Sequence, residues 1–87
     1  MNWKFFRGRR DPVYDEILDR IKGYDNSDHK TLVHARFDER TAAMLSQLKL
    51  ATGIDIQKVV AFSVSELLRQ HPELKITIRK FLESLNE

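Results

Sequence analysis

The stretch from Lys30 to Leu68, KTLVHARFDERTAAMLSQLKLATGIDIQKVVAFSVSELL, contains the pattern that decides the fold. Apolar and polar residues alternate over Thr31–Phe37, which is typical of a short strand with one face inside and one outside. A helical spacing follows, is interrupted at Gly53 and then resumes. The stretch therefore predicts one strand followed by two helices.

The predicted strand has no partner within its own chain. Its backbone N–H and C=O groups need hydrogen-bonding partners, and the same strand of a second copy is the simplest source. The odd-numbered side chains are mostly apolar and are expected to face a core, so the even-numbered ones face outward. The outward set holds no acid and consists of Lys30, Leu32, His34 and Arg36. Two antiparallel copies would form a basic two-stranded ribbon, a shape that fits the major groove of DNA.

Two short motifs in this stretch carry a resemblance to a known family. The segment Arg36–Asp38 (RFD) leads into one helix and Thr52–Asp55 (TGID) leads into the next. This order resembles the ribbon-helix-helix fold of the Arc/MetJ repressor class, over about half of the chain. The resemblance implies an intertwined homodimer, mostly α-helical, with a two-stranded antiparallel ribbon in the major groove and a phosphate held at the start of the second helix.

The resemblance also implies which residues contact DNA. Base edges would be contacted by Lys30, Leu32, His34 and Arg36, with Arg36 on guanine and Leu32 on a thymine methyl group. The phosphate would be held by the backbone amides of Ile56 and Gln57, with help from Lys58. This chain departs from the family by having Asp55 where Ser, Thr or Asn is usual, and Gln57 where a small polar residue is usual. A phosphate contact then requires Asp55 to turn inward as a helix cap.

Family membership implies a role as a transcriptional repressor, an antitoxin, a plasmid partition factor or an accessory protein in conjugative DNA processing. An enzyme is not expected, because the chain has no Cys nucleophile, no Gly-rich phosphate loop and no triad of Ser, His and Asp on one face. The alternative from another class is a small helical adaptor. It would bind a protein partner through the N-terminal residues 1–22.

Composition bounds these hypotheses. The 87 residues allow one small domain with a modest core, which dimerisation would complete. With 15 basic and 13 acidic residues the net charge is only +2, so any DNA contact depends on a local patch. The absence of cysteine fits a reducing cytoplasm. No apolar run reaches membrane-spanning length. The three histidines share no spacing typical of metal ligands. No cofactor or metal is expected.

Flanking segments extend the predicted core of residues 30–70. Residues 1–29 comprise a tail, MNWKFFRGRR, and an amphipathic helix over residues 11–22 that Asp11 caps and Gly23 ends. The tail is either a loose terminus whose aromatic residues pack on the domain, an arm along DNA phosphates, or a grip on a protein or a membrane surface. Residues 71–87 hold a third helix, about 72–85, because Pro72 stops the preceding one at His71.

Within the core, two aspartates are expected to begin the helices. Asp38 would cap a helix over residues 39–52, and Asp55 would cap one from residue 56 to about Gln70. We expect Ile54 to lie between these helices. Phe62 falls off the main apolar face of its helix and is expected to meet the N-terminal helix. The main packing face of that second helix consists of Val59, Val60, Ser63, Val64 and Leu67.

Overall fold

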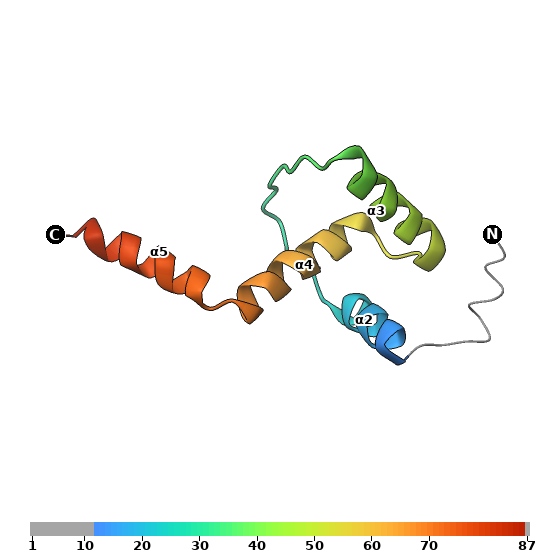
Figure 1. Ribbon diagram of the computed structural model, residues 1–87, viewed down its shortest axis with the longest axis horizontal. Coiled ribbons are helices and arrows are strands. Elements are labelled where there is room, and N and C mark those ends of the chain that lie inside the picture. Colours follow the sequence, from blue (N-terminus) through green and yellow to red (C-terminus); the bar gives the residue numbers. More distant parts are fainter. Residues whose placement is uncertain (1–11, 87) are drawn as a thin grey trace.

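A computed structural model of the protein describes residues 12–86. This part of the chain contains four helices: α2 (Pro12–Gly23), α3 (Glu39–Thr52), α4 (Ile56–Gln70) and α5 (Glu73–Ser84). Figure 1 shows α2 and α3 on either side of α4, with α5 running away from them. The tail and the predicted cap Asp11 lie outside the described residues.

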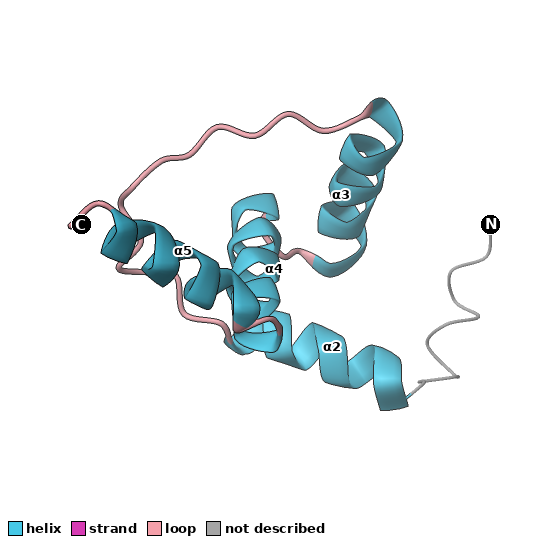
Figure 2. Ribbon diagram, turned by 60° about the vertical axis from the view of Figure 1, so that its left-hand side comes forward, coloured by secondary structure: helices cyan, strands magenta, loops and turns pink. Residues whose placement is uncertain are grey.

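Residues 31–37 are not a strand, and the described part of the chain contains none. They form about half of the long open connection between α2 and α3 (Figure 2). A strand is defined by a ladder of hydrogen bonds to a neighbour, and residues 12–86 of one copy supply no such neighbour. The prediction of a strand is therefore wrong for the single chain, whereas the ribbon of two chains stays a prediction.

The predicted helix boundaries are confirmed in the core, because local hydrogen bonds set them. The Asp38 carboxylate accepts from the Thr41 amide at 3.2 Å, and the Asp55 carboxylate accepts from the Gln57 amide at 3.1 Å. Gly53 ends α3 in the left-handed conformation, with φ of 75°, and donates to the Lys49 carbonyl at 2.7 Å. The third helix, α5, is one residue shorter at each end than predicted.

A small core joins α2 to α4. Its buried side chains are Ile21, Ile54, Val59 and Phe62, and Leu18, Tyr24, Leu45 and Leu48 pack against them. The expected position of Ile54 between the helices is thus confirmed, and so is the contact of Phe62 with the N-terminal helix. The Tyr24 ring also packs edge-on against Phe62, with centroids 5.8 Å apart.

The chain is elongated for its size. Its extents are 61 × 27 × 25 Å and its radius of gyration is 17.2 Å. A compact domain of this length has a radius of gyration of about 12 Å. Packing joins α2 to α4 and α3 to α4, and α5 has no comparable packing with any of them. None of the helices within residues 12–86 is long and apolar enough to cross a membrane.

Candidate nucleic-acid interface

The four residues predicted to contact bases lie on residues 30–37, which we call the open segment. Every residue of the open segment is exposed, on the predicted outer face and on the predicted inner face alike. Leu32, on the predicted outer face, is 73% exposed, and Val33, on the predicted inner face, is 81% exposed. Because one chain buries neither face, the predicted orientation of Lys30, Leu32, His34 and Arg36 stays a prediction.

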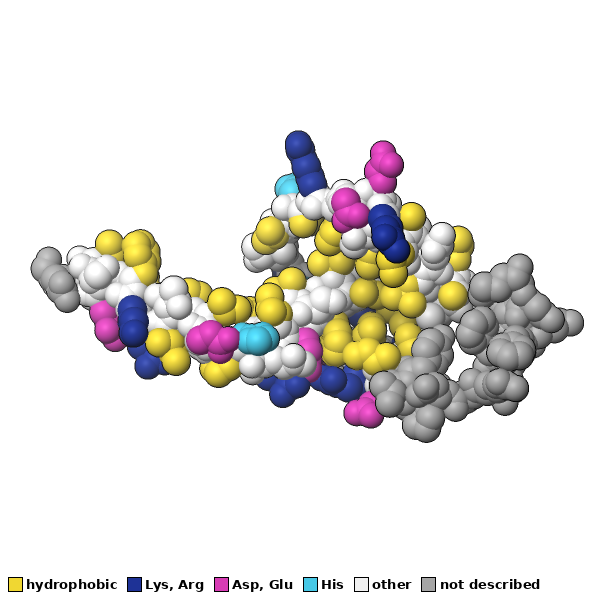
Figure 3. All heavy atoms as spheres, in the orientation of Figure 1, with side chains coloured by type: hydrophobic (Ala, Val, Ile, Leu, Met, Phe, Trp, Pro, Cys, Tyr) yellow, Lys and Arg dark blue, Asp and Glu magenta, His cyan; other side chains and the backbone are white. Residues whose placement is uncertain are grey.

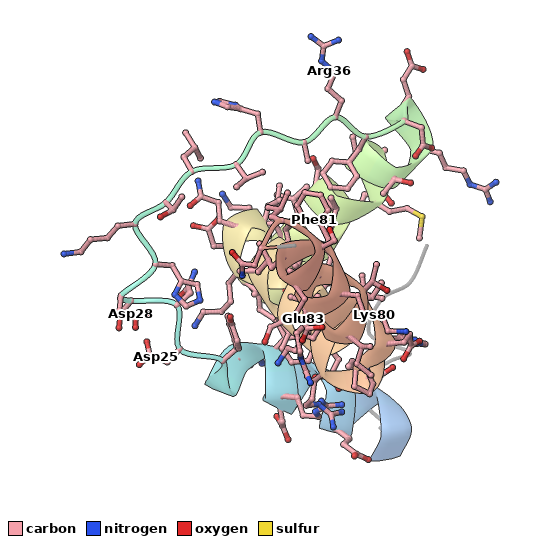
Figure 4. The ribbon with its side chains drawn as sticks, turned by 90° about the vertical axis from the view of Figure 1, so that its left-hand side faces the viewer. Asp25, Asp28, Arg36, Lys80, Phe81 and Glu83 are labelled. Atoms are coloured by element: carbon pink, nitrogen blue, oxygen red, sulfur yellow. The ribbon has the colours of Figure 1, made fainter. Side chains whose placement is uncertain are left out.

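The backbone of the open segment is also unpaired. None of its N–H or C=O groups makes a hydrogen bond to a described residue. Backbone groups in this state satisfy their hydrogen-bonding capacity with water or with another chain. The Arg36 side chain points away from the helices (Figure 4).

Both ends of the open segment are anchored. Before it, the Tyr24 hydroxyl and the His29 ring are joined by a hydrogen bond of 2.8 Å, and Tyr24 in turn packs on Phe62 of α4. After it, Asp38 caps α3 and its pKa is lowered by the hydrogen bond from Thr41, so the cap stays charged. The fold therefore fixes where the segment starts and ends and leaves its middle free to pair.

Acidic side chains lie near the start of the open segment. Asp25 and Asp28 point outward in this loop, away from the end that carries Arg36 (Figure 4). A hydrogen bond from Ser27 lowers the pKa of Asp25, so this carboxylate is charged at neutral pH. Both acids would repel phosphate, so a DNA duplex is favoured toward the Arg36 end of the segment.

The start of α4 is the predicted phosphate site. Asp55 has turned inward as a cap, and its carboxylate takes up the Gln57 amide. Of the two amides predicted to hold the phosphate, only the Ile56 amide makes no hydrogen bond to a described residue. A phosphate that used the Gln57 amide would have to displace the Asp55 carboxylate, and the phosphate contact stays a prediction.

The Lys58 side chain makes a hydrogen bond to the end of α2. Its Nζ donates to the Lys22 carbonyl at 3.4 Å, at the C-terminal end of α2. Lys22, Lys58 and the turn Thr52–Asp55 line a hollow of about 260 Å³. The position of Lys22 in this hollow could not be predicted, because nothing in the linear pattern brings the end of α2 to the start of α4.

An ion-pair cluster joins α2 to α4 on another part of the surface. Glu66 accepts hydrogen bonds from Arg69, Arg20 and Gln70. The bonds from Arg69 and then Arg20 lower the pKa of Glu66 to about 2. Arg20 also lies over the Phe62 ring, 5.4 Å from its centroid. Both arginines are held by the single Glu66 carboxylate, which offsets one of their two positive charges, and we assign them no DNA contact.

Comparisons with protein-family models, with curated proteins and with solved structures found no match to this chain.

Proposed function

We propose that this protein is a dimeric, sequence-specific DNA-binding protein of the ribbon-helix-helix kind. The observation that carries the proposal is the open segment, which is unpaired along its backbone and anchored at both ends. Two such segments placed antiparallel would satisfy each other's hydrogen bonds and form the ribbon. The helix order after it, with capped starts at Asp38 and Asp55, is the order that this architecture requires.

Exposed apolar side chains support the dimer. Phe37 is 47% exposed at the end of the open segment, and Val64 and Leu67 are 52% and 51% exposed on α4. Large exposed apolar side chains on a small chain favour association, because burial removes them from water. Ser63, small and exposed, lies beside them and would let two copies of α4 approach closely.

In the proposed complex the ribbon lies in the major groove. Arg36 donates to guanine, Lys30 and His34 contact neighbouring base edges, and Leu32 packs on a thymine methyl group. Ile56, Gln57 and Lys58 hold a backbone phosphate once Asp55 and the Lys22 carbonyl release their partners. Such a protein would act in the cytoplasm as a repressor, an antitoxin, a plasmid partition factor or a conjugation accessory protein.

The apolar face of α2 is only partly used within the chain. Ile21 is buried at 7% exposure in the core that includes Phe62, whereas Ile17, near the middle of the helix, is 39% exposed. An apolar position for a protein partner therefore remains on α2, and the small helical adaptor is the alternative function.

Binding to a duplex selected from a random pool tests the proposal. Affinity should exceed that for scrambled duplex and fall steeply with salt, because each neutralised phosphate releases counterions. Arg36→Ala should weaken the preference at one base pair per half-site by about 1–3 kcal/mol. Lys58→Ala should lower affinity for all sequences alike and make the salt slope shallower by about one unit.

The matched control is Lys49→Ala, which removes a basic side chain near the end of α3 and should leave both affinity and preference unchanged. The proposal is wrong if no duplex is preferred over scrambled sequence. It is also wrong if Arg36→Ala and Lys49→Ala bind DNA as the unaltered protein does.

A further inference from the structure

The apolar face of α5 is uncovered in the single chain. Three residues of α5 and the residue that follows its last turn form this face at helical spacing, and we call them the α5 stripe: Leu74, Ile78, Phe81 and Leu85. Phe81 is 61% exposed and Leu85 is 64% exposed. The other sides of the helix are charged or polar, apart from Leu82 beside the stripe and Ile76 opposite it. Figure 3 shows hydrophobic side chains along α5, away from those gathered where α3 and α4 meet.

The stripe continues a pattern that begins on α4. Starting at Val60, we count positions that are alternately four and three residues apart. This series includes Val64 and Leu67 on α4 and all four residues of the α5 stripe. Only His71, between the two helices, is not apolar. Helices that pack side by side over a length show this repeat of seven residues. The backbone bends at His71, where ψ is 74°, so the pattern consists of two short helical seams instead of one long one.

This pattern is separate from the core that the chain already has. On α4 the buried residues Val59 and Phe62 face α2, whereas Val64 and Leu67 lie on another side and are exposed. The exposed parts of α4 and α5 therefore form one discontinuous apolar surface, which no described residue covers.

We propose that a second copy of this chain covers the α5 stripe, in the same interface that covers Val64 and Leu67. The seven-residue repeat favours a helix as the partner, and a copy of this chain brings the same repeat. Gln70, Thr77 and Ser84 flank the stripe on one side without charge, so two copies would not repel each other there. The N-terminal tail is a poor occupant of the stripe because the tail is basic. It would be repelled by the basic side of α5, which carries Lys75, Arg79 and Lys80.

The exposed apolar side chains of both helices offer surface for such a partner. Val64 and Leu67 on α4 and Ile78, Phe81 and Leu82 on α5 are 51–61% exposed. A standard interface removes about 800 Å² from each partner, and an interface of that size would cover side chains on both helices.

This inference shares the homodimer with the proposed function but needs no DNA contact. Its test is the dimer dissociation constant of the full chain, from sedimentation equilibrium over a dilution series without DNA. Phe81→Glu, in the stripe, should raise this constant about tenfold or more, because a charge replaces an aromatic ring that the proposed dimer buries. Ile76→Glu is the matched control, since Ile76 is an exposed apolar residue on the opposite side of α5, and it should leave the constant unchanged.

Helix content measured by circular dichroism should be the same in both variants, because neither residue belongs to the buried core. If Phe81→Glu loses helix content, Ile78→Ser serves as a second stripe variant. It should also weaken the dimer. Equal constants for the stripe variants and the control would overturn the inference, and so would an unaltered chain that stays monomeric. A dimer that the stripe variants weaken but that prefers no duplex over scrambled sequence would instead overturn the DNA-binding proposal alone, so the two proposals fail separately.

Discussion

Phe62 is the side chain on which the packing of α2 against α4 depends most. It is 8% exposed and shares the core with Ile21, and Tyr24 packs edge-on against its ring. Phe62→Ala should lower the free energy of unfolding by about 3–5 kcal/mol, which includes the lost transfer free energy and the cavity left behind. The edge-on contact with Tyr24 is worth about 0.5–1.5 kcal/mol beyond area burial, so the cost should lie in the upper part of that range.

That loss is large for this chain, because domains of this length unfold with a total of about 4–13 kcal/mol. Urea unfolding followed by circular dichroism measures it, at one fixed protein concentration because dimerisation would shift the midpoint. Leu50→Ala is the control: Leu50 is 86% exposed on α3, and its truncation should change stability by no more than about 0.5 kcal/mol. A cost below about 1 kcal/mol for Phe62→Ala would refute the packing of α2 on α4.

Three further predictions concern the turn, the ion pairs and the N-terminal segment. Gly53→Ala should cost about 1–2 kcal/mol in urea unfolding, because the φ of 75° strains any L side chain although the space beside it is open. The folded-state pKa of Glu66 is depressed to about 2 from 4.5, so its contribution to stability is present above pH 4.5 and is lost as pH falls toward 2. Glu66→Gln should flatten that part of an acid titration of stability, and an unchanged titration would contradict the ion pairs of Glu66 with Arg69 and Arg20. Deletion of residues 1–28 should leave a folded dimer that is less stable, because Phe62 loses the cover of α2; a wholly unfolded product would show that α2 is indispensable to the core.

The parts of the fold that local chemistry determines could be predicted from the sequence. Asp38, Asp55 and Gly53 act within a few residues of themselves, so the bounds of α3 and the start of α4 follow from the pattern. Even the contact of Phe62 with the N-terminal helix could be inferred, because the residue lies out of phase with the other apolar positions of α4.

Features that depend on distant or external groups could not be predicted. The alternation over Thr31–Phe37 describes what a strand needs, but the ladder requires a partner that one chain lacks. The proximity of Lys22 to Lys58 depends on how α2 packs. Likewise, the sequence indicated an apolar face on α5, but not that the rest of the chain leaves it uncovered.

The pairing of Thr31–Phe37 with a second copy is tested most directly by hydrogen exchange of its backbone amides, measured by NMR above and below the dimer dissociation constant. In an antiparallel pair of strands, every second residue donates its N–H to the partner. Alternate amides from Thr31 to Phe37 should therefore exchange slowly in the dimer and rapidly after dilution. Rapid exchange of all of them in a protein that is demonstrably dimeric would contradict the ribbon, and with it the proposed mode of DNA binding.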